Sequence, residues 1–158
     1  MNIFGRKKRK KPQHKTKWPS PKRAYANKPP GLRAYLLRQA ISQEMPTETM
    51  KAYTTEANRI DNEFSKQNTS ASRLEKAGKL DKAIKIYESM IADLFDGSHP
   101  YTRLRIIYSK QKRYEQAIRV CAQFINMTDQ MIKLGSSRKD LRSKRQQFRE
   151  WKVKLGKK

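Results

Sequence analysis

Apolar residues recur at the three- and four-residue spacing of helices along most of the chain beyond residue 30, and this pattern predicts an all-α protein. Glycines and short polar runs divide the pattern into segments. Gly78 and Gly135 are each placed to end a helix in the left-handed conformation. The expected helices are a short one from Gly31 that ends before Pro46, a long one over residues 48–77, one from Leu80 to Leu94, one that follows Ser98, one from Tyr114 to Leu134 and one from Ser137.

The long second helix contains three consecutive short polar side chains, those of Asn68, Thr69 and Ser70. Such side chains compete for backbone hydrogen bonds, so a break at this point is the alternative to one unbroken or slightly kinked helix, which the continuous apolar rhythm favours. Thr47 is placed to cap its start.

Residues on the inward faces of the later helices are expected to form the core. They are Leu80, Ala83, Ile84, Tyr87, Met90, Ile91 and Leu94; then Tyr101, Leu104, Ile107 and Tyr108; then Ala117, Ile118, Cys121, Phe124, Ile125, Thr128, Met131 and Ile132; and finally Leu141, Phe148 and Leu155, which recur every seven residues.

The segment from Gln67 to Ile125 matches itself at an offset of 34 residues. The paired positions are Leu74 with Tyr108, Leu80 with Tyr114, Asp81 with Glu115, Ala83 with Ala117, Ile84 with Ile118, Lys85 with Arg119, Ile86 with Val120, Tyr87 with Cys121 and Ile91 with Ile125. A period of this length, made of two helices and a turn, indicates a helical repeat whose copies bury their apolar faces against each other.

These two copies resemble the tetratricopeptide repeat family. The resemblance rests on Leu74, Ala83 and Tyr87 in the first copy and on Tyr101, Leu104, Tyr108 and Ala117 in the second. The sequence departs from the family at Gln67, at Ser70-Ala71 and at Arg105, and neither copy has the closing proline. Since about three repeats are normally needed for stability, we expect the helix from 47 and the helix from 138 to close the two ends of the stack.

The resemblance implies a concave face lined by the first helix of each pair. The residues expected there are Asn68, Ser72, Lys76, Thr102, Ile106 and Lys110, with Ser109 beside them. Lys76 and Lys110 are related by the same offset and would favour an acidic peptide or a phosphate; the alternative is that both are solvated lysines near helix ends. Family members that grip a peptide C-terminus use a lysine and asparagines, and because Ser72 stands at one of those places we do not transfer that specificity.

Charge is concentrated at the two ends of the chain. The sequence is 35% hydrophobic and 33% charged, with a net charge of +24. Residues 1–38 contribute +13 without a single acid, residues 39–97 contribute −2, and residues 98–158 contribute +13. A surplus of this size favours a polyanionic partner.

Residues 1–30 combine a basic run with several prolines, so we expect them to be extended and disordered when free. Aromatic residues between cations can stack on unpaired bases while the cations contact phosphates. The predicted nucleic-acid-binding residues are Arg6, Lys7, Lys8, Arg9, Lys10, Lys11, Lys15, Lys17, Trp18, Lys22, Arg23 and Tyr25 near the start, and Arg142, Lys144, Arg145, Arg149 and Lys152 in the last helix. A solubilising arm or nuclear-import signal is the main alternative, and a lipid anchor through Ile3 and Phe4 ranks behind it.

No residue pattern indicates catalysis, so we expect neither an enzyme nor a cofactor. Asp93, Asp96 and His99 could suggest a metal site, yet Asp96-Gly97-Ser98 has the composition of an ordinary turn and helix cap. Cys121 falls at an inward helical position, where a free cysteine acts as a small hydrophobe.

A helix-turn-helix reading of residues 101–124 would place Arg119 in a DNA groove. The internal repeat argues against it, since a DNA-binding motif has no reason to match the preceding segment.

Four regions are expected: a tail over residues 1–30, a short helix and linker over 31–46, the repeat-like domain over 47–135, and a basic helix over 136–158. The sequence predicts a non-enzymatic adaptor that docks a protein and binds nucleic acid, with RNA favoured over DNA. A pure protein-binding scaffold with targeting ends is the alternative. One cysteine, no apolar run long enough for a membrane span and no signal-peptide core predict an intracellular protein, cytoplasmic or nuclear and not secreted.

Overall fold

A computed structural model describes residues 17–42 and 44–158. Its regular elements are α-helices, and the described residues contain no strand. The helices are α1 (Pro30–Gln39), α2 (Thr47–Lys76), α3 (Leu80–Ala92), α4 (His99–Lys110), α5 (Tyr114–Lys133) and α6 (Lys139–Leu155). The predicted all-α fold is therefore confirmed.

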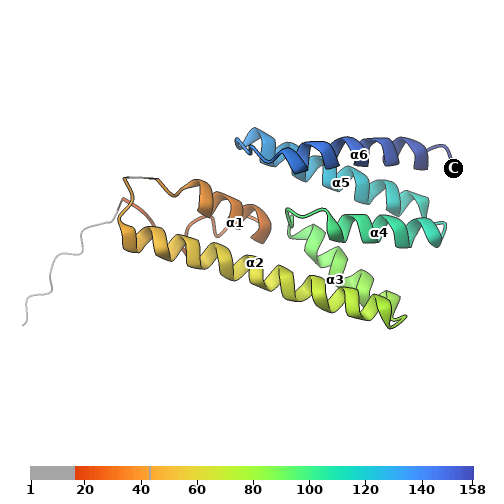
Figure 1. Cartoon of the computed structure of the whole chain (residues 1–158), viewed down its shortest axis with the longest axis horizontal. Coiled ribbons are helices and arrows are strands. Elements are labelled where there is room, and N and C mark those ends of the chain that lie inside the picture. The colour runs from red at the N-terminus through yellow and green to blue at the C-terminus, as the bar shows by residue number, and fades with distance from the viewer. Residues whose placement is uncertain (1–16, 43) are drawn as a thin grey trace, which may run out of the picture.

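Each helix packs against the next helix in the chain. Figure 1 shows α1 lying along the first half of α2, and α3 beside its second half. The α4–α5 hairpin follows on one side of α3, and α6 runs back along α5. The chain thus forms a row of helical hairpins that starts from one long helix.

The long helix α2 is continuous, as the apolar rhythm predicts. Within it the hydroxyl of Thr69 donates to the carbonyl of Ser65, at 2.9 Å. This polar side chain therefore forms its hydrogen bond with the preceding turn and does not break the helix. The expected cap at Thr47 is wrong by one position: Pro46 occupies the N-cap, and no side chain there makes a capping hydrogen bond.

The two hairpin turns repeat each other at an offset of 34 residues. Gly78 has φ +74° and Lys112, its counterpart, has φ +58°. The amide of Lys79 donates to the carbonyl of Leu74 at 2.9 Å, and the amide of Arg113 donates to the carbonyl of Tyr108 at 2.8 Å. Both are the six-residue bond that ends a helix at a left-handed residue, so the sequence offset is also a backbone offset.

The two hairpins differ in the length of their second helix. α3 has 13 residues, whereas α5 has 20. Seven extra residues are about two helical turns, and Gly135, with φ +86°, then ends α5 as predicted. The end of this extension meets α1, where the Tyr35 hydroxyl donates to the carbonyl of Leu134 at 3.2 Å. Tyr35 is buried.

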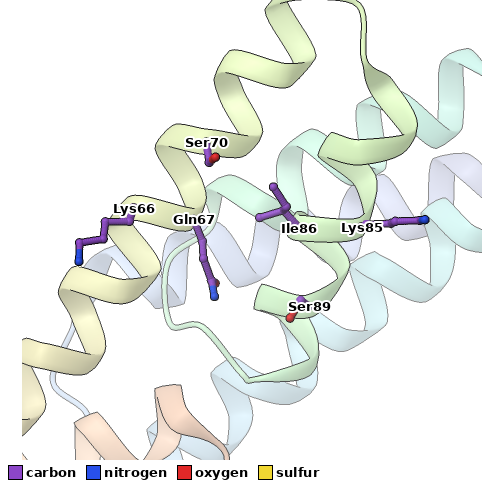
Figure 2. A pocket seen from close by; sticks show the side chains of 6 residues that line it. All are labelled: Lys66, Gln67, Ser70, Lys85, Ile86 and Ser89. Atoms are coloured by element: carbon purple, nitrogen blue, oxygen red, sulfur yellow. The ribbon is translucent and has the colours of Figure 1, made fainter.

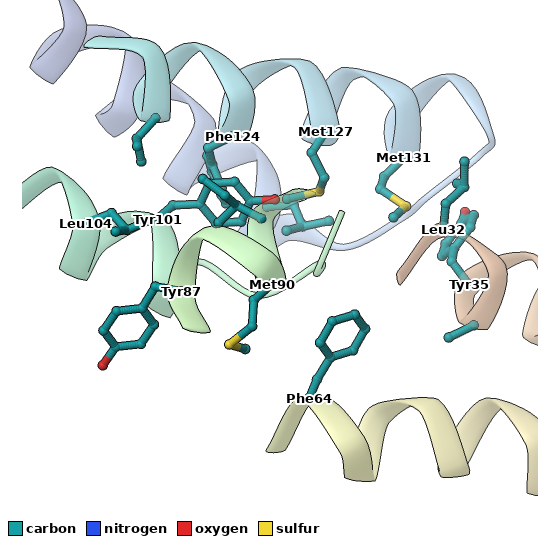
Figure 3. Close-up of a cluster of buried hydrophobic side chains, with 14 of the residues drawn as sticks. Leu32, Tyr35, Phe64, Tyr87, Met90, Tyr101, Leu104, Phe124, Met127 and Met131 are labelled. Carbon is teal, nitrogen blue, oxygen red and sulfur yellow. The ribbon is translucent and has the colours of Figure 1, made fainter. Parts of the chain in front are cut away.

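The core follows the predicted inward positions, with one clear exception. Figure 3 shows Tyr87, Met90, Tyr101 and Phe124 gathered between the helices, and each of these side chains is buried. Leu80 is 37% exposed, contrary to expectation; it is the first residue of α3. Positions that the pattern did not select also lie in the core, namely Leu37, Val120 and Met127.

Aromatic rings connect the last three helices. The ring of Tyr101 lies 5.1 Å from that of Phe124, which stacks on Phe148 at 4.1 Å; Phe148 in turn meets Trp151 at 4.9 Å. Leu141, Phe148 and Leu155 are buried, as their seven-residue spacing predicts. Helix α6 starts at Lys139, two residues after the expected Ser137, and it covers α5 at this end of the row.

Residues 17–29 do not form the extended tail that their composition predicts. The hydroxyl of Tyr53 donates to the carbonyl of Pro19 at 2.9 Å, and the Arg33 guanidinium donates to the carbonyls of Pro21 (2.7 Å) and Ala24 (3.1 Å). Ala24 is buried. Long-range hydrogen bonds from α1 and α2 therefore fix this segment, which its own composition could not reveal. The remaining part of the predicted tail, residues 1–16, lies outside the described residues.

Gly31 allows α1 to approach the end of α3. Its amide donates to the carbonyl of Asp93 at 2.9 Å, and a Cβ atom at this position would lie only 2.1 Å from the carbonyl oxygen of Leu94. Only glycine fits this contact.

No helix of the described residues is both long enough and apolar enough to cross a membrane.

Candidate nucleic-acid interface and peptide groove

Helix α6 presents one flank of cations to solvent, which we call the α6 basic face: Lys139, Arg142, Arg149 and Lys152. Intervals of three, seven and three residues place these side chains along the same side of a helix, and all four are exposed. None of them lies within 4.0 Å of a carboxylate oxygen of the described residues. No carboxylate in the described part of the chain therefore neutralises their charges.

Other predicted nucleic-acid residues of α6 have partners within the fold. Arg145 is partly buried and pairs with Asp129 of α5, so it fixes α6 in place and does not belong to the α6 basic face. Lys144 is exposed and donates to the side-chain oxygen of Gln147 at 3.2 Å. Lys139 was not among the residues predicted to bind nucleic acid, although its interval of three from Arg142 would have identified it.

The predicted aromatic residues near the start of the chain are partly buried. Trp18 lines a hollow of about 280 Å³ with Glu48, Thr49 and Ala52 of α2, among other residues, and Tyr25 sits in a left-handed turn with φ +55°. Both rings pack against the core, so neither is carried on an extended arm.

The cations beside them differ in their surroundings. Lys17 pairs with Glu44 at 3.0 Å, whereas Lys22 and Arg23 are exposed. The other predicted residues, Arg6, Lys7, Lys8, Arg9, Lys10, Lys11 and Lys15, lie outside the described residues.

A hollow of about 350 Å³ lies between α2 and α4, at part of the surface where the sequence predicts a peptide groove. It is lined by Ser72, Glu75, Lys76, His99 and Arg103. Two of these, Ser72 and Lys76, were predicted from the repeat, while Glu75, His99 and Arg103 were not. The missed signal is a pair of opposite charges, one near the end of α2 and one near the start of α4, on helices that the repeat places side by side.

Hydrogen bonds connect the floor of this hollow. Glu75 pairs with Arg103 and accepts from the Tyr87 hydroxyl at 3.3 Å. The Ser72 hydroxyl lies 3.3 Å from the Tyr87 hydroxyl and 3.5 Å from Nε2 of His99. The arrangement gathers several hydrogen-bonding side chains in one surface hollow.

The charges of the hollow leave a single net cation. The hydrogen bonds that Glu75 accepts from Arg103 hold the pKa of Glu75 below its usual value, although burial opposes this effect. Burial first, and then the nearby Arg103, lower the pKa of His99, so the imidazole is neutral at pH 7. Glu75 and Arg103 cancel, and Lys76 remains; the hollow therefore has a modest preference for anionic groups.

No protein family model, no curated protein and no solved structure matches this chain. The resemblance to tetratricopeptide repeats accordingly stays a prediction.

The remaining predicted groove residues are not brought together with Ser72 and Lys76. The hydroxyl of Thr102 donates to the carbonyl of Ser98, one turn earlier in the chain, at 2.9 Å. Ile106 is partly buried and Lys110 is exposed, and neither lines the hollow. The side-chain oxygen of Asn68 is buried and accepts no hydrogen bond from the described residues.

The residues considered for metal binding and catalysis each interact with a different part of the fold. Asp96 pairs with Arg138 at 2.7 Å, and His99 lies beside Ser72; the described residues contain no cluster of three or more metal-binding side chains. Cys121 is buried, as predicted, and burial raises the pKa of its thiol to about 11. Arg119, one of the side chains that a helix-turn-helix would use together with Arg113, Gln116 and Gln123, is paired with Glu88 of α3.

Proposed function

We propose that this protein is a non-enzymatic adaptor that binds RNA, or the RNA surface of a ribonucleoprotein, through the α6 basic face and the basic run of residues 6–11, and that docks a protein on its helical repeats. The observation that carries the proposal is the contrast in ion pairing. Cations at helix contacts, such as Arg103, Arg138 and Arg145, have carboxylate partners, whereas the four cations of the α6 basic face have none among the described residues.

The position of α6 favours contacts to phosphates over the reading of base edges. The helix packs along α5 through Leu141, Phe148 and Leu155, so one side is committed to the core and only its outer flank reaches a ligand. Phosphate contacts position a nucleic acid without selecting its sequence. RNA is favoured over a chosen DNA site because such a flank can follow a single strand without entering a groove.

The salt dependence of RNA binding tests this half of the proposal. Fluorescence anisotropy of a labelled 20-nucleotide single-stranded RNA with the full chain, between 50 and 200 mM salt, measures the slope of log K against log salt concentration. About eight phosphate contacts predict a slope of about −6 on a single strand, and about −7 on a duplex. A slope near zero would remove RNA binding from the function.

The hollow lined by Ser72, Glu75, Lys76, His99 and Arg103 supports the protein-docking half. A scaffold that binds only proteins, with basic ends that serve for targeting, is the competing function. Nuclease treatment of complexes isolated with the full chain separates the two: an adaptor on RNA is released by the nuclease, while a pure scaffold stays with its partner.

A further inference from the structure

The α2–α3 hairpin has an open side that faces away from α4. Ser72 and Glu75 of α2 contact α4, whereas Ser70 and Arg73 lie on the opposite flank of the same helix, given its periodicity. On that flank a hollow of about 410 Å³ separates α2 from α3. We call it the edge groove; it is lined by Lys66, Gln67, Ser70, Lys85, Ile86 and Ser89.

The edge groove is the middle part of a longer depression. A hollow of about 190 Å³ adjoins it through Gln67 and extends to Arg59 and Pro30, with Glu63 and Asp93 also in its lining. Another of about 300 Å³ shares Lys66 and Ser70 and extends to Arg73, so the cations lie at the α3 end of the depression. From Arg59 to Arg73 the depression follows α2 for about 21 Å. This is the length of a helix of about four turns, and it lies where a further helix of a repeat stack would pack.

The floor of the edge groove is partly apolar and has an unused hydrogen-bond acceptor. Figure 2 shows Ile86 of α3 and Gln67 of α2 reaching into the space between the two helices. Ile86 is only partly covered by the core. The side-chain oxygen of Gln67 is buried and accepts no hydrogen bond within the described part of the chain, a state that a donor from a bound segment would relieve.

The rim of the edge groove is cationic. Lys66 and Lys85 extend to its two outer sides (Figure 2), and Arg73 lies seven residues beyond Lys66 on α2, which is about two turns. Arg73 and Lys85 have no carboxylate partner within 4.0 Å among the described residues, and Lys66 makes only an exposed pair with Glu63 at 3.6 Å. The cations gather beside the second half of α2, so an acidic segment would find its complement there.

This charge excludes two other occupants. A second copy of the chain that extended the row end to end would bring α6, its other terminal helix, against this rim, and the α6 basic face would be repelled by Lys66 and Lys85. The basic run of residues 6–11 would be repelled in the same way.

We propose that the edge groove binds an acidic amphipathic helix of a partner protein, which packs as an additional helix of the row. Apolar side chains at intervals of three and four residues would cover Ile86, and carboxylates on the flank would pair with Arg73 and Lys85. The edge groove shares no lining residue with the hollow at Ser72 and Lys76, so this inference adds a second docking surface to the proposed function and is independent of its RNA half.

A peptide titration with the full chain tests the groove. The probe is a labelled synthetic 15-residue helix that carries leucines along one face and glutamates beside them; its controls are the same peptide with lysines in place of glutamates, and a shuffled peptide without the apolar face. We expect the glutamate helix to bind at least about ten-fold more tightly than either control. Equal binding of the shuffled peptide would overturn the proposal, since the groove would then select charge alone.

Two charge reversals localise the site. The variant Arg73→Glu with Lys85→Glu should weaken binding of the glutamate helix about ten-fold or more, while the matched variant Lys28→Glu with Lys133→Glu, which changes the net charge equally at exposed positions elsewhere, should leave it unchanged. Equal losses in both variants would overturn the proposal.

Two further results would contradict the chosen occupant. Sedimentation that reveals a dimer which Arg73→Glu with Lys85→Glu abolishes would assign the groove to a second copy. Displacement of the peptide by RNA as effectively as by unlabelled peptide would assign it to nucleic acid. The salt slope for RNA, measured on the same variant, is expected to stay unchanged, so failure of the groove and failure of RNA binding are distinguishable.

Discussion

Arg33 of α1 and Glu56 of α2 form a largely shielded ion pair, with Nη1 of the arginine 2.9 Å from a carboxylate oxygen and side-chain exposures of only 13% and 11%. The same guanidinium donates to the carbonyls of Pro21 and Ala24. One side chain therefore connects α1, α2 and the segment before α1. This relationship explains why residues 17–29 are ordered although their composition predicts an extended tail.

Replacing Arg33 should destabilise the fold strongly. In Arg33→Ala the carboxylate of Glu56 loses a largely buried partner, and three hydrogen bonds from the guanidinium to backbone carbonyls are lost as well. We therefore expect the free energy of unfolding to fall by about 3 kcal/mol. Urea unfolding followed by circular dichroism measures the change. The matched control is Arg38→Ala, which breaks the more exposed pair with Asp61 and should cost less than about 1 kcal/mol. Similar losses in the two variants would contradict the role assigned to Arg33.

The same carboxylate makes stability depend on pH. Hydrogen bonds from Arg59, and then from Arg33, lower the pKa of Glu56 below its usual 4.5 although burial opposes them. A lowered pKa in the folded state means that its contribution is fully present above about pH 4.5 and is lost as the pH falls through the folded-state pKa. In Glu56→Gln this loss should be absent.

Unfolding curves between pH 3 and 7 measure that difference. The pKa of Asp96 is raised by burial and has the opposite effect on stability, but it is common to the wild type and to Glu56→Gln, so the comparison removes it. A Glu56→Gln curve parallel to that of the wild type across this range would refute the assignment.

Gly78 and Lys112 test whether the two turns are equivalent. An added Cβ at Gly78 meets no atom within 4 Å, so Gly78→Ala is penalised only by its φ of +74°, and we expect a loss of about 1 kcal/mol. Lys112 already adopts φ +58° at the cost of left-handed strain; Lys112→Gly should therefore raise stability by about 0.5 kcal/mol. Thermal unfolding distinguishes the signs, and a loss in both variants would show that the turns are not equivalent.

The helices and their order could be predicted from the local sequence pattern, because the hydrogen bonds that end a helix join residues only a few positions apart in the chain. The offset between Gly78 and Lys112 is visible in sequence, since they lie five residues before Ala83 and Ala117, respectively. The longer α5 was predicted for the same reason. What the pattern could not supply was the packing of Trp18 and Tyr25, which depends on Arg33 and Tyr53 far along the chain.

The candidate sites were predictable to different degrees. The spacing of Arg142, Arg149 and Lys152 on a helix is a local property, so the α6 basic face follows from sequence. Arg145 was assigned to the same set, because only the structure places Asp129 beside it. The edge groove was missed entirely, since sequence alone does not indicate that α1 covers only the first half of α2.

Cys121 should be chemically inert in the folded protein. The side chain is buried, and burial raises the pKa of its thiol to about 11, so little thiolate exists at pH 8 and little of it is accessible. We expect a thiol-reactive disulfide reagent to modify the native protein at least about 100-fold more slowly than the urea-unfolded chain. The control, Cys121→Ser with Ser137→Cys, carries an exposed thiol and should react rapidly in both states. Fast native modification of Cys121 would contradict its place in the core.

Removing two cations from the α6 basic face should weaken RNA binding without affecting the fold. Each phosphate contact on a single strand contributes about 0.7 to the salt slope, so Arg142→Ala with Arg149→Ala should reduce its magnitude by about 1.4 and lower affinity about ten-fold near 100 mM salt. Both side chains are exposed and alanine favours helices, so stability should change by less than about 0.5 kcal/mol.

A matched variant separates contact from net charge. Lys79→Ala with Lys82→Ala removes the same two charges from exposed positions near the α2–α3 turn, away from α6. If RNA contacts the α6 basic face, only the arginine variant changes the slope, because released counterions report phosphates in contact and not the total charge. Equal changes in both variants would mean that the protein attracts RNA through its overall charge of +24. In that case α6 would serve mainly to cover α5.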